Sequence, residues 1–538
     1  MTNYKAEKSQ TTKMNSNFTF AYILIFAFQF AESYTSGHQS FSNPWTIESQ
    51  DGVLNVYLID ELANVSVAGQ VVLSRVWNKS FTGPLLKCKP GDLVNLYLQN
   101  NLPSEDTNIH FHGFHVSPLP PADYVLQEFP NDGRIKLYTF TIPLDHPPGL
   151  YWYHSHAMSI SEYQIFNGMS GGFIIEGLSQ LIGAVGLQEQ VILLRDVQIF
   201  EGKLPIRQKY QGEAATTRLV NDMICPLMNV SFNETQLWSI ANIGADITYY
   251  LAWEPTDMNN TWIEGVNIYL VARDGNALNQ KISITHPYVL GPANRAQFLV
   301  EFPSSRVSTK QIKFVTRNWM NGINGNLFPY TELIVVNVNE ESSISSFPNL
   351  TMPALLDYRN SNITETRTMY FSESSNGETS FYINFKVFVL GRVDVRVVLG
   401  SVEKWILVNA SPEAHYFHIH QGSFQVVSIN GVPQVFNGYV DTVLLPAPND
   451  GTGNIPTIVE VIIPFNDPLQ VGTYIFHCHI EAHADAGMMS IIQVINPPKV
   501  DVVFLSIACP VLFIIFLVSN AYLAIQKYRE RMKIKTTV

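Results

Sequence analysis

The chain has 538 residues, of which 46% are hydrophobic and 14% charged, which is enough apolar material for several packed cores. Acidic residues outnumber basic ones by 45 to 33, so the chain has no surplus of positive charge for a polyphosphate, and nucleic acid is not expected as a partner. At about 150 residues per domain the length predicts three or four domains, and we expect three.

The N-terminus has the features of a signal peptide. Three lysines precede an apolar run over residues 18–30, and Ala31 and Ser33 follow with the spacing of a small-x-small cleavage site. We therefore predict a signal peptide over residues 1–33. An uncleaved membrane anchor is the alternative, although about 13 apolar residues barely span a bilayer.

Short strand-like segments fill the chain between its two apolar ends. Apolar and polar residues partly alternate in them, Gly, Pro and Asn separate them, and long amphipathic helical periods are absent. Examples are residues 52–59, 93–98, 135–142 and 457–463. The pattern predicts an all-β protein built from sandwiches or barrels.

An internal repeat connects the beginning and the end of this β-region. The segment GDLVNLYLQN at residues 91–100 corresponds to GSVEKWILVN at 400–409. Further on, GLYWYHSH at residues 149–156 matches GTYIFHCH at 472–479 position by position. Two copies of one β-domain therefore flank the middle third of the chain.

The repeat sets the predicted domain boundaries. The two copies span residues 40–177 and 346–498. Residues 178–345 between them have similar strand-like runs but a single histidine, His286. We expect this middle third to be another copy without metal ligands.

Ten of the 14 histidines fall in four tight clusters, each with a His-x-His pair, although composition alone predicts fewer than one such pair. Residues i and i+2 of a strand project to the same face, so each pair can aim two imidazoles at one buried spot. Imidazole nitrogens are good ligands for copper and zinc. The clustered histidines are His110, His112, His154, His156, His415, His418, His420, His477, His479 and His483. Ordinary structural roles are expected for His38, His115, His146 and His286.

Cys478 lies between the two histidines of the last His-x-His pair, so its side chain should leave the strand on the opposite face. One strand can thus serve two metal sites. A thiolate, two imidazoles and a weak axial thioether are the ligands of a blue copper site. His483 and Met488 follow Cys478 closely, and His415 can supply the second imidazole.

The C-terminal end has the features of a membrane anchor. Residues 502–525 carry no charge, and five basic residues follow them. By length and by the positive-inside rule, this pattern predicts a transmembrane helix over 502–525 and a cytosolic basic tail over 526–538. The ectodomain would face the outside of the cell or a lumen.

Two weaker features agree with an extracellular or luminal chain. Cys509 lies in the apolar run and Cys478 in the metal motif, so Cys88 and Cys225 remain for a disulfide, which the sequence leaves open. Asn-x-Ser/Thr triplets are acceptor sites for N-glycosylation. They occur at Asn64, Asn78, Asn229, Asn233, Asn259, Asn349, Asn362 and Asn409.

The histidine motifs resemble those of the multicopper oxidases, the family of laccases, ascorbate oxidases and ferroxidases. They are HFHG from His110, WYHSH from Trp152, HYFHIHQ from His415 and HCHIEAHADAGM from His477, in the family's order and spacing. The resemblance covers the whole ectodomain. It implies three cupredoxin-like Greek-key β-sandwich domains, four copper ions, and oxidation of a small reductant coupled to four-electron reduction of dioxygen to water.

The resemblance also implies a role for each motif residue. The type 1 copper would be bound by His415, Cys478, His483 and the axial Met488. The type 2 copper would be bound by His110 and His418, and the type 3 pair by His112, His154, His156, His420, His477 and His479. Ser155 stands in the first repeat where Cys478 stands in the last, so only the last repeat can hold a blue copper. Electrons would enter at His415 or His483 and pass through Cys478 to His477 and His479.

Oxygen reduction needs protons, which a carboxylate near the cluster usually supplies. Asp123 follows His110 at the distance where laccases carry such an acid, although Tyr124 replaces the glycine usual in fungal laccases. An aspartate in a solvated loop is the alternative. Glu481, inside the last motif, is a weaker candidate because its side chain could point at solvent.

The motifs leave the reducing substrate open among phenols, aromatic amines, and ferrous or cuprous ions. A C-terminal anchor resembles yeast-type ferroxidases, which pair with an iron permease. The acid that those enzymes place four residues before the type 1 histidine is Ser411 here, with Glu413 two residues away. Laccase-like and metal-ion oxidation therefore both remain, and no Met-rich insert indicates a cuprous-ion specialist.

Two other classes of protein fit the sequence less well. A copper-free cupredoxin scaffold in adhesion or assembly is disfavoured because no ligand is missing. A copper nitrite reductase is excluded by the length of the chain and by the type 3 histidines.

Overall fold

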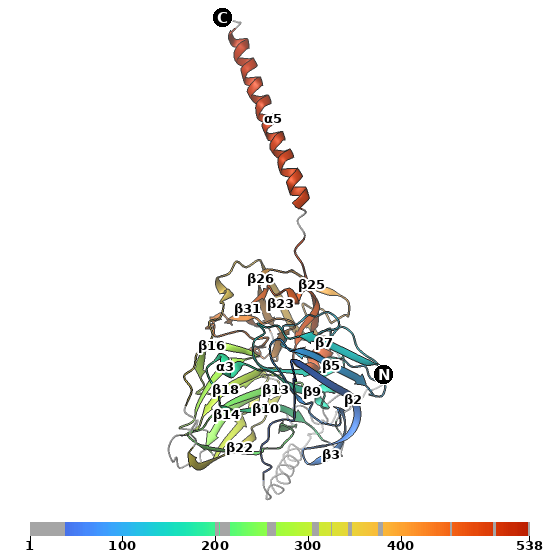
Figure 1. Ribbon diagram of the computed structural model, residues 1–538, viewed down its shortest axis with the longest axis vertical. Helices are drawn as coiled ribbons and strands as arrows, with labels where there is room; N and C mark the ends of the chain where they lie inside the picture. Colours follow the sequence, from blue (N-terminus) through green and yellow to red (C-terminus); the bar gives the residue numbers. More distant parts are fainter. Residues whose placement is uncertain are drawn as a thin grey trace, which may run out of the picture.

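The computed structural model describes residues 38–199, 204, 216–255, 265–303, 311–323, 325–342, 347–374, 380–451, 454–498 and 502–535. The predicted signal peptide, residues 1–33, lies outside the described residues. Within them, six larger β-sheets form three successive pairs, accompanied by one two-stranded hairpin. A helix at the C-terminal end projects away from the sheets (Figure 1).

The first unit, residues 46–175, consists of a four-stranded sheet of order β3-β2-β5-β7 and a five-stranded sheet of order β1-β4-β9-β8-β6. Side chains from both sheets share one hydrophobic core. Alternate residues of β5 are buried, as expected for a strand with one face on the core. The strands are β1 (Thr46–Glu48), β2 (Val53–Val67), β3 (Gln70–Trp77), β4 (Leu85–Cys88), β5 (Leu93–Asn100), β6 (His110–His112), β7 (Ile135–Thr141), β8 (Gly149–His154) and β9 (Ser170–Ile175).

The middle unit, residues 188–342, pairs a six-stranded sheet, β11-β10-β13-β18-β15-β16, with a five-stranded sheet, β12-β22-β19-β14-β17. The hairpin β20-β21 accompanies them. Its strands are β10 (Gln188–Val197), β11 (Thr217–Val220), β12 (Leu227–Phe232), β13 (Thr235–Asn242), β14 (Tyr249–Pro255), β15 (Asn267–Arg273), β16 (Asn276–Ser283), β17 (Tyr288–Leu290), β18 (Arg295–Glu301), β19 (Gln311–Thr316), β20 (Trp319–Met320), β21 (Leu327–Phe328) and β22 (Thr331–Ser342).

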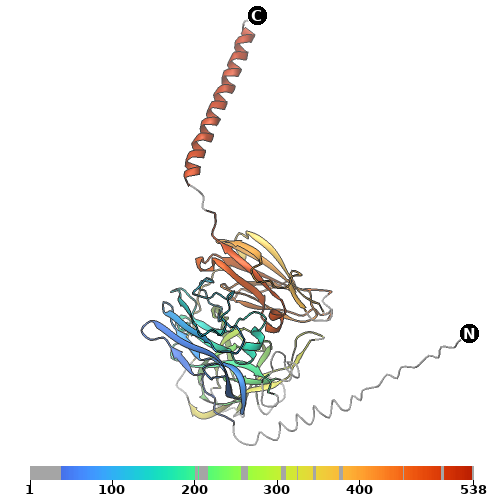
Figure 2. The same ribbon diagram turned by 90° about the vertical axis from the view of Figure 1, so that its right-hand side faces the viewer.

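The last unit, residues 365–495, pairs a six-stranded sheet, β24-β23-β26-β31-β28-β29, with a five-stranded sheet, β25-β33-β32-β27-β30. Figures 1 and 2 show it as the unit nearest to the C-terminal helix. Its strands are β23 (Glu365–Ser374), β24 (Ser380–Ile383), β25 (Val393–Val398), β26 (Ser401–Asn409), β27 (His415–Ile419), β28 (Gln425–Ile429), β29 (Val432–Pro433), β30 (Thr442–Leu445), β31 (Thr457–Phe465), β32 (Gly472–Cys478) and β33 (Met489–Ile495).

The sequence repeat corresponds to a repeated strand arrangement. In the first unit β5 lies between a parallel neighbour, β2, and an antiparallel neighbour, β7. In the last unit β26 has the same two kinds of neighbour, β23 and β31. The middle unit repeats the pattern with β13 between β10 and β18. The middle third therefore shares the arrangement of the two copies that flank it.

The helices are short except for the last one. They are α2 (Ser161–Phe166), α3 (Leu178–Leu181), α4 (Glu481–Asp485) and α5 (Val502–Lys535), with the 3-10 turns η2 (Tyr358–Asn360) and η3 (Pro468–Gln470). Helix α5 continues through the basic segment that begins after residue 525. No helix in the part of the chain that the structure describes is long and apolar enough to cross a membrane.

Two features of the sequence have a different outcome in the structure. Cys88 and Cys225 are both free thiols, so the disulfide that the sequence left open is not formed. Asn409, one of the predicted glycosylation sites, is fully buried at the end of β26. Its amide nitrogen donates to three backbone carbonyls, so in the folded chain this triplet is inaccessible and the prediction for Asn409 is wrong.

Candidate metal centres

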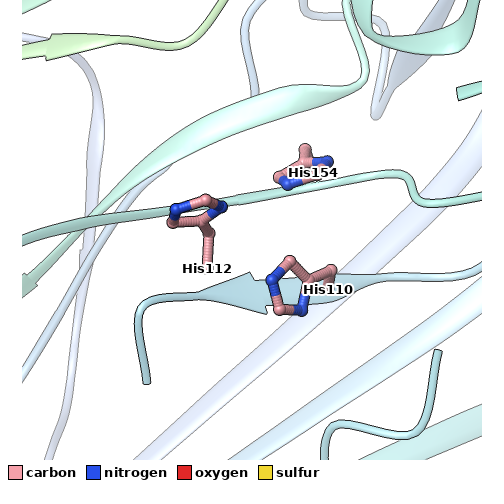
Figure 3. Close-up of side chains that lie close together, drawn as sticks. All are labelled: His110, His112 and His154. Atoms are coloured by element: carbon pink, nitrogen blue, oxygen red, sulfur yellow. The ribbon is translucent and has the colours of Figure 1, made fainter. Parts of the chain in front are cut away.

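Eight histidines meet at the interface between the first and the last unit, and we call them the histidine cluster. They come from the neighbouring strand pairs β6–β8 and β27–β32, where His110 lies opposite His154 and His418 opposite His477. Figure 3 shows His110 and His112 on one strand and His154 on its neighbour. All eight are buried: His110, His112, His154, His156, His418, His420, His477 and His479.

Hydrogen bonds at one nitrogen of several rings turn the other nitrogen inward. The Nδ1 atoms of His154 and His477 lie 2.8 and 2.9 Å from backbone carbonyl oxygens. His418 Nδ1 is 2.8 Å from the carbonyl oxygen of Asp441. The Nε2 atoms of His110, His154 and His418 are buried and have no hydrogen-bond partner. A buried nitrogen without a partner is costly unless it binds a ligand, so these atoms fit a metal site.

The cluster divides into two triplets and a pair. The Nε2 atoms of His156 and His420 each lie 3.4 Å from Nε2 of His477. On the other side, His479 Nε2 is 3.3 Å from His112 Nδ1, and the His154 ring lies 5.5 Å from the His479 ring. His110 and His418 remain, with their rings 6.1 Å apart. The resemblance implies that the pair binds the type 2 ion and that the other six histidines bind the two type 3 ions.

Burial and the neighbouring rings keep these imidazoles neutral. Burial lowers the pKa of His156 and of His418 to about 4, and burial together with the neighbouring histidines lowers the pKa of His110 well below its usual range. A neutral imidazole has a free lone pair, which is the form that binds a metal ion. The donor set therefore fits copper.

A second centre, which we call the cysteine site, lies in the core of the last unit. Cys478 Sγ is 3.6 Å from His415 Nδ1 and 3.8 Å from His483 Nδ1, and all three side chains are buried. His415 begins β27, Cys478 ends β32, and His483 lies on α4. Met488 is buried beside them, and its carbonyl accepts a hydrogen bond from the Cys478 backbone N–H.

The two faces of β32 separate the two centres. Tyr474, Phe476 and Cys478 point into the core of the last unit. His477 and His479 point to the opposite face, into the histidine cluster. The alternation predicted from the sequence is therefore present, and one strand carries donors for both centres.

Of Cys88, Cys225 and Cys478, only Cys478 has a lowered pKa. Burial raises its pKa, but hydrogen bonds to His415 and His483 outweigh burial and lower the pKa to about 6. Burial instead raises the pKa of Cys225 to about 11, and it also raises the pKa of Cys88. Since the thiolate is the form that binds metal, only Cys478 is prepared as a ligand.

The outer nitrogens of the cysteine site are also held. His415 Nε2 lies 2.5 Å from Ser411 Oγ, and His483 Nε2 lies 3.2 Å from Glu413 Oε1. The Phe381 ring stacks on His483 with centroids 4.1 Å apart. These contacts orient both Nδ1 atoms toward Cys478. Glu413 lies outside the histidine motifs, and its contact with His483 was not expected from the sequence.

Asp123 lies beside the histidine cluster. It is 1% exposed, so the solvated-loop alternative is wrong. One carboxylate oxygen is 3.0 Å from His110 Nδ1, and the carboxylate accepts hydrogen bonds from the Phe111 N–H and the Gln421 amide. Burial raises the pKa of Asp123 to about 7.

Glu481 is fully buried, so the expectation that it could face solvent is wrong. Its Oε1 lies 3.2 Å from His479 Nδ1, and its Oε2 accepts a hydrogen bond from Ser161 on α2. Ser161 also donates to Asp485, so a hydroxyl connects two carboxyl groups across the interface of the first and last units. Sequence reasoning also missed Asp441, which contacts His112, and Arg295, which pairs with Asp441; both lie outside every motif.

Comparison with known proteins agrees with this geometry. Two family models described as multicopper oxidase match residues 61–180 and 347–498, which together make up half of the chain. Multicopper oxidase mco of Staphylococcus haemolyticus is 25% identical over 430 residues, 78% of this chain and 83% of the relative. The laccase of Bacillus subtilis is 22% identical over 502 residues, 79% of this chain and 91% of the relative.

Solved structures share the fold. A multicopper oxidase from Campylobacter jejuni, described as a metallo-oxidase, superposes with a TM-score of 0.69 and 23% sequence identity. The superposition covers 87% of this chain and 97% of that chain. Together with the two matched models and the two buried centres, these findings show that the chain belongs to the multicopper oxidase family.

Proposed function

We propose that the histidine cluster and the cysteine site hold the four copper ions of this oxidase, and that its electron donor is a metal cation. As a multicopper oxidase the chain is a copper-dependent oxidoreductase that takes electrons from a reductant and reduces dioxygen to water. His415, Cys478, His483 and Met488 would hold the type 1 ion, His110 and His418 the type 2 ion, and the two histidine triplets the type 3 pair. Copper bound there supplies the one-electron redox chemistry and the place of oxygen reduction.

The main chain of β32 joins the two centres. Cys478 belongs to the cysteine site, and its covalent neighbours His477 and His479 belong to the histidine cluster. The path from the thiolate to either imidazole therefore runs through bonds of adjacent residues. Copper held by Cys478 would therefore be connected through bonds of the main chain to two histidines of the cluster.

Two buried carboxyl groups would supply protons. Asp123 holds a proton beside His110 on one side of the cluster, and Glu481 holds one beside His479 on the other. Burial raises the pKa of Glu481 well above its usual range, as it does for Asp123, so both groups retain a proton near neutral pH. A retained proton is what a general acid needs at the operating pH.

The donor proposal rests on a pair of carboxylates at the edge of His483. Glu413, whose side chain is 19% exposed, contacts His483 Nε2, and its other oxygen accepts a hydrogen bond from the Asn321 amide at 3.1 Å. Glu373 shares a hydrogen bond with Glu413. Carboxylate oxygens are ligands for divalent cations, so the pair would bind a ferrous ion beside the ring through which electrons enter.

The proton on this pair should make the binding of ferrous ion depend on pH. Burial and the charge of Glu413 raise the pKa of Glu373 to about 7. Below about pH 7 the pair holds a proton that a cation must displace, so the KM for ferrous ion should rise as the pH falls. A neutral phenol does not compete with that proton, and its KM should change less.

The test compares oxygen uptake with ferrous ion and with a phenolic donor in the copper-loaded chain. Glu373→Gln removes a charge without removing the contact of Glu413 with His483. We expect the KM for ferrous ion to rise about tenfold, since one charge pair near a surface is worth about 1–4 kcal/mol. The KM for the phenol should stay within about twofold.

Glu460→Gln is the matched control, because Glu460 is a carboxylate of the same unit that pairs with Lys404. This substitution should leave the KM for both donors unchanged. An equal effect of Glu373→Gln on both donors, or faster turnover with the phenol, would contradict a cationic donor and favour laccase-like oxidation. Oxygen uptake with neither donor despite bound copper would favour the scaffold class.

We infer the cellular location from the sequence. The uncharged run over residues 502–525 and the basic residues after it support a single membrane anchor, with the ectodomain outside the cytosol and the tail inside. A metal permease in the same membrane would then be the partner that takes up the oxidised ion. Protease treatment of sealed vesicles should remove a tag at residue 538 only when the cytosolic face is accessible, and cleavage from the other side contradicts the orientation.

A further inference from the structure

We propose that Arg295, on a strand of the middle unit, is a positioning residue for the histidine cluster. It fixes Asp441, and Asp441 in turn orients His112 from the first unit and His418 from the last unit. The proposal rests on the assignment of these two histidines as copper ligands. It gives the middle unit, whose described residues contribute no ligand to either centre, a direct part in building the oxygen-reducing site.

Arg295 forms a two-point ion pair with Asp441. Its Nη1 and Nη2 atoms donate to the two carboxylate oxygens at 2.9 and 2.6 Å. Arg295 and Asp441 are 1% and 0% exposed, so no water competes for these bonds. Parallel N–H donors from a planar guanidinium fix both the distance and the rotation of a carboxylate, which a lysine cannot do.

Arg295 is itself held from three directions. Its Nη1 donates to the Ala293 carbonyl at 2.9 Å and its Nε to the Leu150 carbonyl of the first unit at 3.3 Å. Its backbone N–H donates to Asp274, which lies in the turn after β15, at 2.9 Å. The guanidinium therefore has little freedom to move, and it transmits the position of the middle unit to Asp441.

Asp441 contacts ligands from both flanking units. Its Oδ1 lies 3.2 Å from His112 Nε2, and its backbone carbonyl lies 2.8 Å from His418 Nδ1. Thr442 Oγ1 donates to the same Oδ1 at 2.9 Å and lies 3.2 Å from His418 Nδ1. The rings of His112 and His418 stack with centroids 3.9 Å apart. One residue thus fixes the orientation of two adjacent rings through the nitrogen of each that faces away from the cluster.

These outer contacts decide which nitrogens face the cluster. With Nε2 of His112 at Asp441, its Nδ1 points toward His479. With Nδ1 of His418 at the Asp441 carbonyl, its Nε2 stays free in the cluster. A carboxylate or carbonyl at the second nitrogen is the usual way in which proteins orient a histidine ligand.

The glycine of the HFHG motif supports the same assignment. Gly113 follows His112 and has a φ of +84°, which favours glycine. A Cβ atom at this position would lie 2.5 Å from Arg295 Nη2 and 2.5 Å from Asp441 Oδ2. The ion pair therefore packs directly against the backbone beside a ligand, and any side chain at residue 113 would displace it.

Asp441 is also close enough to be a metal ligand itself, since its oxygen lies within 4.8 Å of the ligand atoms of His112 and His418. Both of its oxygens, however, are engaged by the guanidinium. A carboxylate shared in this way is a better orienting group than a metal donor. Arg295 could also serve only to join the three units, and the experiment is designed to separate these roles.

The test uses the full chain loaded with copper and compares Arg295→Met with Arg195→Met. Arg195 is the matched control because it is also a buried arginine of the middle unit that reaches the first unit, through the Ile165 carbonyl and Thr82. It contacts none of the cluster histidines. Copper per chain, the type 2 electron paramagnetic resonance signal, and the type 3 and blue absorption bands are measured for each variant.

We expect Arg295→Met to keep the blue band while losing the type 2 signal and the type 3 band, so that copper falls from four ions per chain toward about one. Arg195→Met should unfold at a lower temperature but retain all four ions. If Arg295→Met yields no folded protein, Arg295→Lys and Asp441→Asn should fold and show altered type 2 hyperfine splitting with an unchanged blue band. An unchanged type 2 signal in these variants would overturn the proposal. So would loss of the blue band together with the type 2 signal and the type 3 band.

Discussion

The first and the last unit place the same strand at the same interface, yet only one of them builds a cysteine site. Ser155 and Cys478 occupy equivalent positions between two histidines. The backbone N–H of Ser155 donates to the Met169 carbonyl, and that of Cys478 donates to the Met488 carbonyl. A methionine carbonyl therefore accepts the equivalent backbone hydrogen bond in both units.

The difference lies in the side chains around the central residue. His415 stands three residues before the third His-x-His pair. The residue at the same place before the first pair is Thr107. In the first unit the hydroxyls of Thr107 and Ser155 both donate to the side-chain oxygen Oε1 of Gln164. The side-chain Nε2 of Gln164 donates to the backbone carbonyl of Asp106. The place of a metal ion is thus filled by an uncharged hydrogen-bonded group. In the last unit the same place is surrounded by a thiolate and two imidazole nitrogens.

The comparison shows how one scaffold separates two tasks. The interface face of the strand carries two histidines in both units, because the histidine cluster needs both halves. The core face is free to differ, since it packs inside one unit. The presence of a cysteine site is therefore decided by a few side chains in one core and not by the fold.

Cys478→Ser makes the last unit like the first and has the largest expected effect. The blue band should vanish and turnover should fall to background with every donor, because no thiolate then links the donor to the cluster. Copper should fall to about three of the four ions, because the histidine cluster is intact. Cys88→Ser, which removes a buried thiol of the first unit, should keep the blue band and the turnover. A blue band in Cys478→Ser would contradict the assignment.

Asp123→Asn tests the histidine cluster, to which both units contribute ligands. We expect the oxidation of the reduced enzyme by dioxygen to slow by about 10²-fold, the usual contribution of a general acid. The protonated carboxyl is the donor, so with the wild-type residue the rate should fall as the pH rises through about 7, and this fall should be absent in the variant. Stopped-flow reoxidation measures both.

Asp132→Asn provides the control for that experiment. Asp132 is an acid of the same unit that pairs with Arg134 away from the histidine cluster. Its substitution should leave the reoxidation rate and its pH dependence unchanged. Equal slowing by both substitutions would show that Asp123 has no specific role.

Ser155→Cys is the converse substitution and has the smallest expected effect. Without histidines near residue 155 on the core face, the new thiol should bind no copper and give no second blue band. Loss of the hydrogen bond to Gln164 should lower the free energy of unfolding by about 1 kcal/mol. Copper content, absorption and thermal unfolding measure this, and a fifth copper ion would show that a thiol alone can recruit one.

The sequence determined the class of fold and the candidate ligand residues. Alternation of apolar residues gave the strands, because one face of each strand must reach a core, and the segments 93–98 and 457–463 lie in β5 and β31 as expected. The His-x-His spacing placed two rings on one face for the same geometric reason. The alternation also put Cys478 on the opposite face from His477 and His479.

The tertiary structure decided what surrounds those ligands. Glu413, Asp441 and Arg295 reach the centres from outside the motifs, over separations of up to 329 residues in the case of His112 and Asp441. Burial of Asp123 and of Glu481 likewise depends on the packing of two units against each other. Local spacing fixes which side chains share a strand face, but only the packing of distant strands fixes which charges and hydrogen bonds reach them.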